Sequence, residues 1–337
     1  MRNKMVAAAL MAAGAIGTGV AGIGVATAAG PELFKDKTIS YIVATAPGGG
    51  YDLYGRLIAR HMEMALPGAT VVVKNVPGAG HMIGANSIYA AKPDGFTIGT
   101  FSPGMVYAQL ADNPGVKFDL GKMSWIGKAA SDPHVIMTSA TSPYASFDDL
   151  RKAKSPIKVA ASGVGAFAYT EFVMISRVFK LNTNFILGYQ GNATEMAMRR
   201  DEIDAVLGSF SSYESFVKNG YGRFVLQIGG VAPAGVAVGR DVAKTDSEKA
   251  IVSLIESQTE LGRFTAGPPG IPADPLAVLR GAYRKALEDP ALQAQALKAD
   301  RPVEPLYGEE VATRIRAALN QTPEMIALVK EIMAPAK

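Results

Sequence analysis

Three short strands, each followed by a glycine-rich loop and a helix, constrain the fold more than any other feature of the sequence. The first strand, Thr38 to Thr45, leads into Pro47-Gly48-Gly49-Gly50 and then into apolar residues at helical spacing. The other two lead into Asn75 to Gly80 and into Ser162 to Gly165. Strands that alternate with helices form parallel-type sheets flanked by helices. The sequence therefore predicts the α/β fold class.

The order of these units predicts two lobes. A short apolar strand between Val135 and Thr138 closes the first series, and a second α/β series begins with a helix at Phe147. Within that series Asn192, followed three residues later by Glu195, resembles a capping box at a helix start. Two lobes joined by crossing strands are the simplest architecture for this order.

The C-terminal part of the chain is predicted to be helical. Asp274-Pro275 and Thr322-Pro323 each place a capping residue before a proline at the first helical position. We expect these helices to pack back on the first lobe. The expected division is residues 29–137 with 233–337 for the first lobe and 138–232 for the second.

The N-terminal residues are typical of a secretory signal peptide. Arg2 and Lys4 precede an uncharged stretch rich in Ala and Gly from Met5 to Pro31, and Ala26-Thr27-Ala28 supplies small residues at the expected cleavage spacing. A membrane anchor is the alternative, but Ala and Gly contribute little transfer free energy. We therefore predict that residues 1–28 are a signal peptide and that the mature protein is periplasmic.

The composition excludes several function classes. Of 337 residues, 48% are hydrophobic and 19% charged, which allows a substantial core. The absence of cysteine excludes disulfides, thiolate nucleophiles and cysteine-ligated metals. The formal net charge of +4 falls by two to +2 without Arg2 and Lys4, and no dense Lys/Arg run predicts nucleic-acid binding. His61, His81 and His134 lack metal-ligand spacing, so we propose no metal site.

The first glycine loop suits an anion. It lies where a strand passes into a helix, so the helix N-terminus can offer free N–H groups to a ligand. A dinucleotide fingerprint would need glycine where Leu53 stands, and a phosphate loop would need Gly-Lys-Ser/Thr, so we expect no cofactor. Asp52 would lie in the first helical turn, where it either belongs to the site or only stabilises the helix start.

The glycine loops belong to a longer ordered set of segments. These are Ile42-Val43-Ala44 before Pro47-Gly48-Gly49-Gly50 and Asp52, then Asn75-Val76-Pro77-Gly78-Ala79-Gly80, Lys92-Pro93-Asp94-Gly95-Phe96-Thr97, Gly163-Val164-Gly165, Tyr189-Gln190-Gly191 and Pro268-Pro269-Gly270-Ile271-Pro272. With them the chain resembles the extracytoplasmic solute receptors of tripartite tricarboxylate transporters, over essentially the whole mature sequence. The resemblance implies a type II periplasmic-binding-protein fold, with a ligand carboxylate held between the lobes by backbone N–H groups, hydroxyls and water, and no arginine clamp.

The resemblance also implies a set of ligand contacts from both lobes. They are Gly48, Gly49, Gly50, Tyr51, Asp52, Ala79, Gly80 and Ser102 from the first lobe, and Ser162, Gly163, Gly165, Ala166, Phe167, Tyr189 and Ser209 from the second. Tyr51, Phe167 and Tyr189 could instead be ordinary core or hinge aromatics.

Four residues depart from the family pattern. Tyr51 stands where the family commonly has Thr, Ala166 where it has Ser, His81 where it has Gly, and Gln190 where it has Lys. A lost hydroxyl and an added ring shift the site toward apolar contact. We therefore hypothesise a ligand larger or less polar than citrate.

The predicted function is capture of a small di-, tri- or aromatic carboxylate by hinge closure. The partners implied by the resemblance are one large and one small transmembrane transporter subunit, and we expect a monomer. One alternative is an exported α/β enzyme acting on a carboxylate or ester, which would need a base such as Asp52. The other is a ligand-sensing module for a membrane kinase. No Gly-x-Ser-x-Gly elbow is present, so we assign no catalytic residue.

Overall fold

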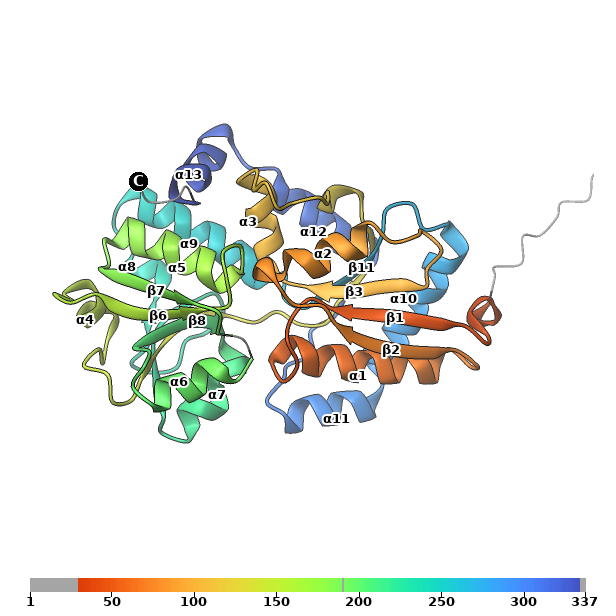
Figure 1. Ribbon diagram of the computed structural model, residues 1–337, viewed down its shortest axis with the longest axis horizontal. Helices are drawn as coiled ribbons and strands as arrows, with labels where there is room; N and C mark the ends of the chain where they lie inside the picture. The colour runs from red at the N-terminus through yellow and green to blue at the C-terminus, as the bar shows by residue number, and fades with distance from the viewer. Residues whose placement is uncertain (1–29, 190, 334–337) are drawn as a thin grey trace, which may run out of the picture.

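Two lobes of similar build lie side by side in the computed structural model, which describes residues 30–189 and 191–333 (Figure 1). Each lobe contains one six-stranded sheet flanked by helices, so the predicted α/β fold with two lobes is confirmed. The predicted signal peptide lies outside the described residues. Within residues 30–189 and 191–333, no helix has the length and apolar character needed to cross a bilayer.

The sheet of the first lobe is mixed. Its strands, in spatial order, are β12 (Leu306–Tyr307), β4 (Ser124–Lys128), β11 (Phe264–Gly267), β3 (Thr97–Phe101), β1 (Thr38–Val43) and β2 (Thr70–Asn75). Strand β1 pairs in parallel with β2 and β3, whereas β11 is antiparallel to both β3 and β4. Phe101, Trp125 and Phe264 pack edge to face across the central strands and form part of the core.

Helices cover this sheet on both sides. They are η1 (Pro31–Phe34), α1 (Gly50–Ala65), η2 (Ala79–His81), α2 (Met82–Tyr89), α3 (Gly104–Leu110), η3 (Leu120–Lys122), α10 (Ala273–Glu288), α11 (Pro290–Lys298) and α12 (Glu309–Leu319). Helix α1 buries Tyr54, Ile58 and Met62, four residues apart, against the sheet and α10. Gly55 allows the close approach, because a Cβ there would lie 2.5 Å from Val43 Cγ2.

The second lobe repeats the arrangement. Its sheet has the order β10 (Ala237–Val238), β9 (Gly222–Ile228), β5 (His134–Ser139), β8 (Ala205–Ser209), β6 (Ile157–Ala161) and β7 (Thr183–Leu187). Its helices are α4 (Phe147–Arg151), α5 (Phe167–Phe179), α6 (Ala193–Arg199), α7 (Phe210–Lys218), α8 (Gly239–Val242) and α9 (Asp246–Thr259). Strand β6 pairs in parallel with β7 and β8, and β5 is antiparallel to β8 and β9.

In each sheet, an antiparallel strand follows a crossing between the lobes. Residues 129–133 lead into β5, and residues 260–263 lead into β11. Backbone hydrogen bonds join the crossings, from Ala129 N to Arg263 O (3.1 Å) and from Asp132 N to Thr259 O (3.0 Å). Helices α8 and α9 pack on β9. The expected boundary after residue 137 falls inside β5, and that after residue 232 falls before β10. Both strands belong to the second sheet.

The C-terminal helix α13 (Pro323–Met333) joins the lobes. It lies against α5 of the second lobe and α3 of the first, which corrects the expectation that it packs on the first lobe alone (Figure 1). Its predicted cap is present, since Thr322 Oγ1 accepts the Met325 N–H at 3.2 Å. Asp274 is not a cap, because α10 begins at Ala273 and Asp274 lies in its first turn.

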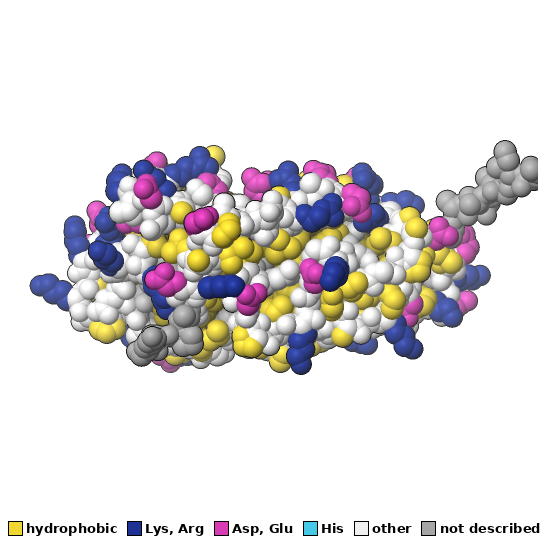
Figure 2. Space-filling view, turned by 90° about the horizontal axis from the view of Figure 1, so that it is seen from above, with side chains coloured by type: hydrophobic (Ala, Val, Ile, Leu, Met, Phe, Trp, Pro, Cys, Tyr) yellow, Lys and Arg dark blue, Asp and Glu magenta, His cyan; other side chains and the backbone are white. Residues whose placement is uncertain are grey.

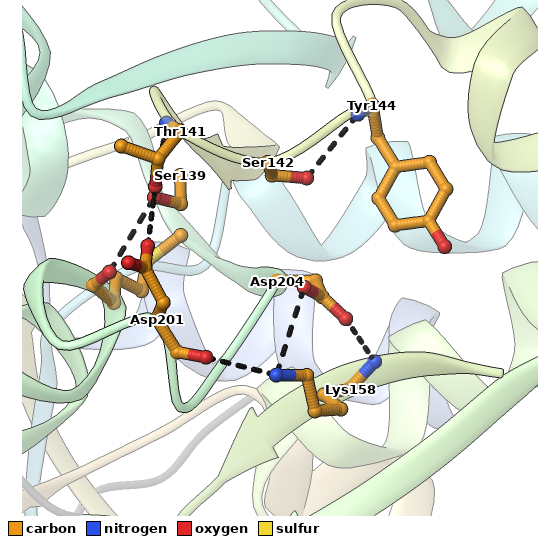
Figure 3. Close-up of polar contacts among 8 residues, drawn as sticks. Ser139, Thr141, Ser142, Tyr144, Lys158, Asp201 and Asp204 are labelled. Atoms are coloured by element: carbon orange, nitrogen blue, oxygen red, sulfur yellow. Dashed lines mark hydrogen bonds and ion pairs between the residues drawn. The ribbon is translucent and has the colours of Figure 1, made fainter. Parts of the chain in front are cut away.

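Polar side chains form hydrogen bonds at the end of the second sheet that is farthest from the glycine loops. Figure 3 shows Lys158 and Asp204 facing each other there, with Asp201, Ser139 and Thr141 alongside. Asp204 Oδ2 accepts the Lys158 N–H at 2.8 Å, and Lys158 Nζ donates to Asp201 O at 2.8 Å. Lys158, Asp204, Asp201, Ser139 and Thr141 each hydrogen-bond within the protein, so the cluster serves the fold.

Candidate functional site

A cavity of about 150 Å³ lies between the lobes, at the carboxyl ends of β1, β6 and β8. Parallel α/β sheets bind ligands at this edge. The structure brings these predicted contacts into its wall: Gly48, Gly49, Gly50, Tyr51, Ser162, Phe167, Tyr189 and Ser209. The remaining predicted contacts lie outside the wall, namely Asp52, Ala79, Gly80, Ser102, Gly163, Gly165 and Ala166.

Two of the three helices that begin at the cavity have no side-chain cap. Helix α7 starts after Ser209, and the carboxylate of Asp132 accepts its Ser211 N–H at 3.1 Å. Helix α1 starts after Gly49 and α5 after Ala166, and neither N-cap residue makes a capping hydrogen bond through its side chain. Glycine and alanine have no side-chain acceptor to offer. The N–H groups and positive dipole ends of these helices are therefore directed toward the space between the lobes.

The pattern at Asn192 and Glu195 is not a capping box. Asn192 is the N-cap residue of α6, but its side chain makes no capping hydrogen bond. Both side chains line the cavity instead. Burial raises the pKa of Glu195, and the charge of Arg301 opposes this shift.

Asp52 holds the first glycine loop in shape. Its carboxylate accepts the Gly48 N–H at 3.0 Å and the Asn75 side-chain amide at 2.8 Å, and it forms an ion pair with Arg56 at 2.9 Å. Burial raises the pKa of Asp52, but the hydrogen bonds from Arg56, Gly48 and Asn75 prevail and lower it below its usual value. Asp52 therefore positions the start of α1 and stands outside the cavity.

The second and third glycine loops touch each other across the lobes. A Cβ on Gly80, at φ 62°, would lie 2.3 Å from Ala166 N and 2.5 Å from Val164 O. Gly163 lies next to the Gly80 amide in the same contact. Ser102 is fully buried, and its hydroxyl accepts the Gly104 N–H at 3.2 Å. Gly80, Gly163 and Ala166 therefore form the contact between the two loops.

Arg263 forms part of the cavity wall although it is only 2% exposed. Its guanidinium lies over the Tyr51 ring at 4.3 Å and the Tyr54 ring at 5.3 Å. Its Nη2 lies 3.3 Å from Asp132 Oδ2, so the two crossings are also joined by a buried ion pair. Tyr51 is thus a stacking partner for Arg263 as well as a wall residue.

Arg301 reaches the cavity from the loop between α11 and β12. Its Nη1 donates to the carbonyl of Ser211 in the second lobe and to Asp300 O at 3.2 Å. Burial and the neighbouring charge of Arg263 lower the pKa of Arg301. Two arginines therefore converge on a site for which the resemblance implied no arginine clamp.

Unpartnered polar atoms gather on the first-lobe side of the cavity. Nine buried side-chain nitrogen or oxygen atoms have no hydrogen-bond partner in the described chain. Four of them, Thr45 Oγ1, His81 Nδ1, Arg263 Nε and Arg301 Nε, belong to residues of the cavity wall. A buried unpaired polar group costs about 1–3 kcal/mol, so such a cluster indicates a binding site.

A larger hollow between the lobes has different chemistry. We call it the α9–α12 groove; it has a volume of about 970 Å³, with Glu256 and Glu260 on one side and Arg314 on the other. It contains two ion pairs, Arg240 with Glu256 and Arg314 with Glu260. None of its lining residues, all within the described chain, has a buried side-chain atom without a partner.

Sequence reasoning missed the cationic part of the wall. His81 had one signal, since it replaces a glycine usual in the family. Arg263 and Arg301 had none, because one lies in a crossing and the other in a loop remote from every glycine motif.

The fold and the cavity define the class of two-lobed periplasmic binding proteins. Residues 55–332 match the family model described as "Tripartite tricarboxylate transporter family receptor", and the chain belongs to this family. The family resemblance seen in the sequence is therefore confirmed.

Two curated relatives come from Bordetella pertussis. One, described as a UPF0065 protein, is 25% identical over 282 residues, which cover 79% of this chain and 81% of the relative. The other, protein BugT, is 28% identical over 177 residues, which cover 50% of this chain and 52% of BugT.

Solved structures share the fold at low identity. The periplasmic binding protein BugD has a TM-score of 0.72 at 21% identity, covering 88% of this chain and 97% of BugD. MatC of Rhodopseudomonas palustris, described with bound malate, has a TM-score of 0.70 at 18% identity, covering 88% of this chain and 99% of MatC. The R. palustris protein Rpa4515, described with adipate, has a TM-score of 0.69 at 14% identity, covering 87% of this chain and 97% of Rpa4515.

Proposed function

We propose that this protein captures a small organic carboxylate in the cavity between its lobes and delivers it to a membrane transporter. The observation that carries the proposal is the cluster of four unpartnered polar atoms on the first-lobe wall. Arg263 Nε and Arg301 Nε can only donate hydrogen bonds. A carboxylate supplies two acceptor oxygens and would remove the cost of leaving such donors unpaired.

The charge balance of the wall also favours an anion. Arg263 and Arg301 are permanent cations, while Glu195 is the acidic residue of the wall. Burial lowers the pKa of His81 to about 4, so His81 is neutral at pH 7. The uncapped starts of α1 and α5 add positive dipole ends on the same cavity.

The volume of the cavity favours a compact ligand. At about 150 Å³ it is smaller than the roughly 300–1,000 Å³ pockets that hold drug-sized molecules. This speaks against a ligand larger than citrate. MatC and Rpa4515 are described with malate and adipate, which are open-chain dicarboxylates, and acids of this kind are the first to test.

The enzyme alternative loses its candidate base. Asp52 lies outside the cavity and its carboxylate is occupied by Gly48, Asn75 and Arg56. We also propose that the receptor works with one large and one small transmembrane subunit. It is further predicted to lie in the periplasm and to be a monomer. On the face seen in Figure 2, Lys and Arg are interspersed with Asp and Glu, which does not suit a nucleic-acid backbone.

A ligand screen tests the proposal. Thermal unfolding of the purified mature protein is measured with mono-, di-, tri- and aromatic carboxylates, and the acids that stabilise it are then titrated by calorimetry. A ligand at about 100 times its Kd should stabilise the fold by about 2.7 kcal/mol. The methyl ester or amide of each acid is the matched control and should not bind. The proposal would be contradicted if the esters stabilised the protein as strongly as the acids do, or if none of the acids stabilised it.

A further inference from the structure

His81 occupies a backbone conformation that favours glycine. It has φ 81° and ψ −4°, in the left-handed region, at the start of α2. A side chain is costly there, and glycine would avoid that cost. Residues held in such conformations cluster at functional sites, where the strain is balanced by a task. We therefore expect the imidazole to make an interaction at this position that a glycine could not make.

The imidazole forms part of the cavity wall and stands against an aromatic neighbour. Its ring centroid lies 5.9 Å from that of Tyr51, and the ring planes are inclined by 53°. His81 Nδ1 is buried and has no hydrogen-bond partner in the described chain. The ring is thus placed at the cavity while its own polar group is left unsatisfied by the protein.

The neutral state of His81 separates its task from that of the arginines. Arg263 and Arg301 meet a carboxylate with charge, whereas an uncharged imidazole offers one hydrogen-bond donor and one acceptor. Such a group suits a neutral polar substituent of the ligand. A site built to bond a hydroxyl rejects the analogue that lacks it, because the polar group of the site is then left unpaired.

We propose that His81 determines specificity by hydrogen bonding to a hydroxyl, keto or amino substituent of the bound carboxylate. The inference rests on the proposed function, since it requires an organic acid in the cavity. It adds that the receptor distinguishes acids of equal length by a neutral substituent.

Matched pairs of acids test this directly. Calorimetry measures the Kd of acetate and glycolate, propionate and lactate, succinate and malate, and glutarate and 2-oxoglutarate for the wild type, His81→Gly and His81→Asn. In every pair that binds, we expect the wild type to prefer the substituted acid by at least about tenfold. His81→Gly should lose this preference while it keeps binding the plain acid. His81→Asn, which tolerates the left-handed region and keeps a polar group, should retain part of it.

Stability provides a second readout. His81→Gly should raise the melting temperature by about 2–4 °C through relief of the backbone cost, so affinity and stability should move in opposite directions. Lys180→Gly is the matched control, because Lys180 also has a left-handed φ of 57° but is exposed at the end of α5. It should raise the melting temperature without changing any preference.

The outcomes separate the two proposals. A preference that survives in His81→Gly, or equal wild-type affinity for both members of each pair, overturns the role of His81 and leaves the receptor function standing. Absence of binding by every acid contradicts the receptor function itself.

Discussion

Of the two hollows between the lobes, the α9–α12 groove is the larger, but the cavity has the more unpartnered polar atoms. The α9–α12 groove has about 970 Å³ and the cavity about 150 Å³. The groove contains pairs of charges that satisfy each other, such as Arg314 with Glu260. The cavity contains arginines with unpartnered Nε atoms and helix starts without side-chain caps. We propose that unsatisfied polar groups, and not volume, mark the cavity as the ligand site.

The largest effect should come from Arg263→Met. The change removes a cation from the cavity wall and leaves the buried Asp132 carboxylate with the N–H and hydroxyl of Ser211 but without its cationic partner. We expect the affinity for the bound acid to fall by at least about 100-fold, and the free energy of unfolding to fall by about 3–5 kcal/mol. Titration calorimetry and urea unfolding measure the two quantities.

Arg314→Met is the control in the groove. Its ion pair with Glu260 is exposed, so we expect less than about 1 kcal/mol of lost stability and less than about a twofold change in affinity. An equal loss of affinity in both variants, or none in a folded Arg263→Met protein, would erase the distinction between the two hollows.

The next effect should come from Gly80→Ala, which tests the contact that closes the cavity. The added Cβ would stand 2.3 Å from Ala166 N, so the second and third glycine loops could not meet. We expect the Kd to rise by about tenfold or more, because about 1.4 kcal/mol of lost contact already corresponds to tenfold. Solution scattering with saturating ligand should show a more open molecule than the wild type.

Gly281→Ala serves as its control. Gly281 lies within α10, and a Cβ there meets open space. It should leave affinity and shape unchanged and stabilise the helix by up to about 1 kcal/mol. A Gly80→Ala variant that binds and closes like the wild type would show that the contact between the loops is dispensable.

A smaller effect is expected in the pH dependence of stability. His81 is neutral in the folded protein, with a pKa of about 4, whereas histidine in an unfolded chain has a pKa of about 6.5. As the pH falls from about 6.5 to 4, the unfolded chain takes up the proton first, so folding stability is lost over this range. Below pH 4 the contribution of His81 changes no further.

Comparison with His81→Gly isolates this contribution. Urea unfolding of both proteins at pH 7, 5.5 and 4.5 should show the wild type losing stability relative to the variant as the pH falls. A difference that stays constant with pH would show that His81 is charged, or freely solvated, in the folded state.

The smallest effect on binding should come from the far end of the second sheet. Asp204→Ala removes the acceptor of the Lys158 N–H, so we expect a loss of about 1–2 kcal/mol of stability. The Kd for the acid should not change, since Lys158 and Asp204 lie at the N-terminal ends of β6 and β8 and the cavity lies at their carboxyl ends. A change in affinity would indicate that the far end is coupled to the site.

The alternation of strands and glycine loops was sufficient to predict both lobes and one edge of the cavity. Gly48 to Tyr51, Ser162 and Ser209 line it because loops after parallel strands meet at one edge of a sheet. The position of β5 could not be predicted in this way. A short apolar strand shows neither its direction nor its sheet, and antiparallel pairing with β8 and β9 decides both.

The cations of the site were beyond sequence reasoning for a related reason. Arg263 and Arg301 approach the cavity only through the crossing and the loop after α11, which the fold brings together. The capping box predicted at Asn192 and Glu195 was wrong, because the same three-residue spacing occurs in residues that cap a helix and in residues that face a cavity. Local spacing predicts elements, whereas a site between lobes depends on distant segments.

The guanidinium Nε–H groups themselves provide the most direct test. Nitrogen-15 NMR spectra of the protein, assigned with Arg263→Met and Arg301→Met, are recorded while the tightest-binding acid from the screen is titrated. We expect the Nε–H signals of Arg263 and Arg301 to shift and to saturate with the calorimetric Kd, while that of Arg314 in the groove stays in place. Saturation by the acid with both cavity signals unmoved would contradict the claim that these unpartnered donors exist to hold an anion.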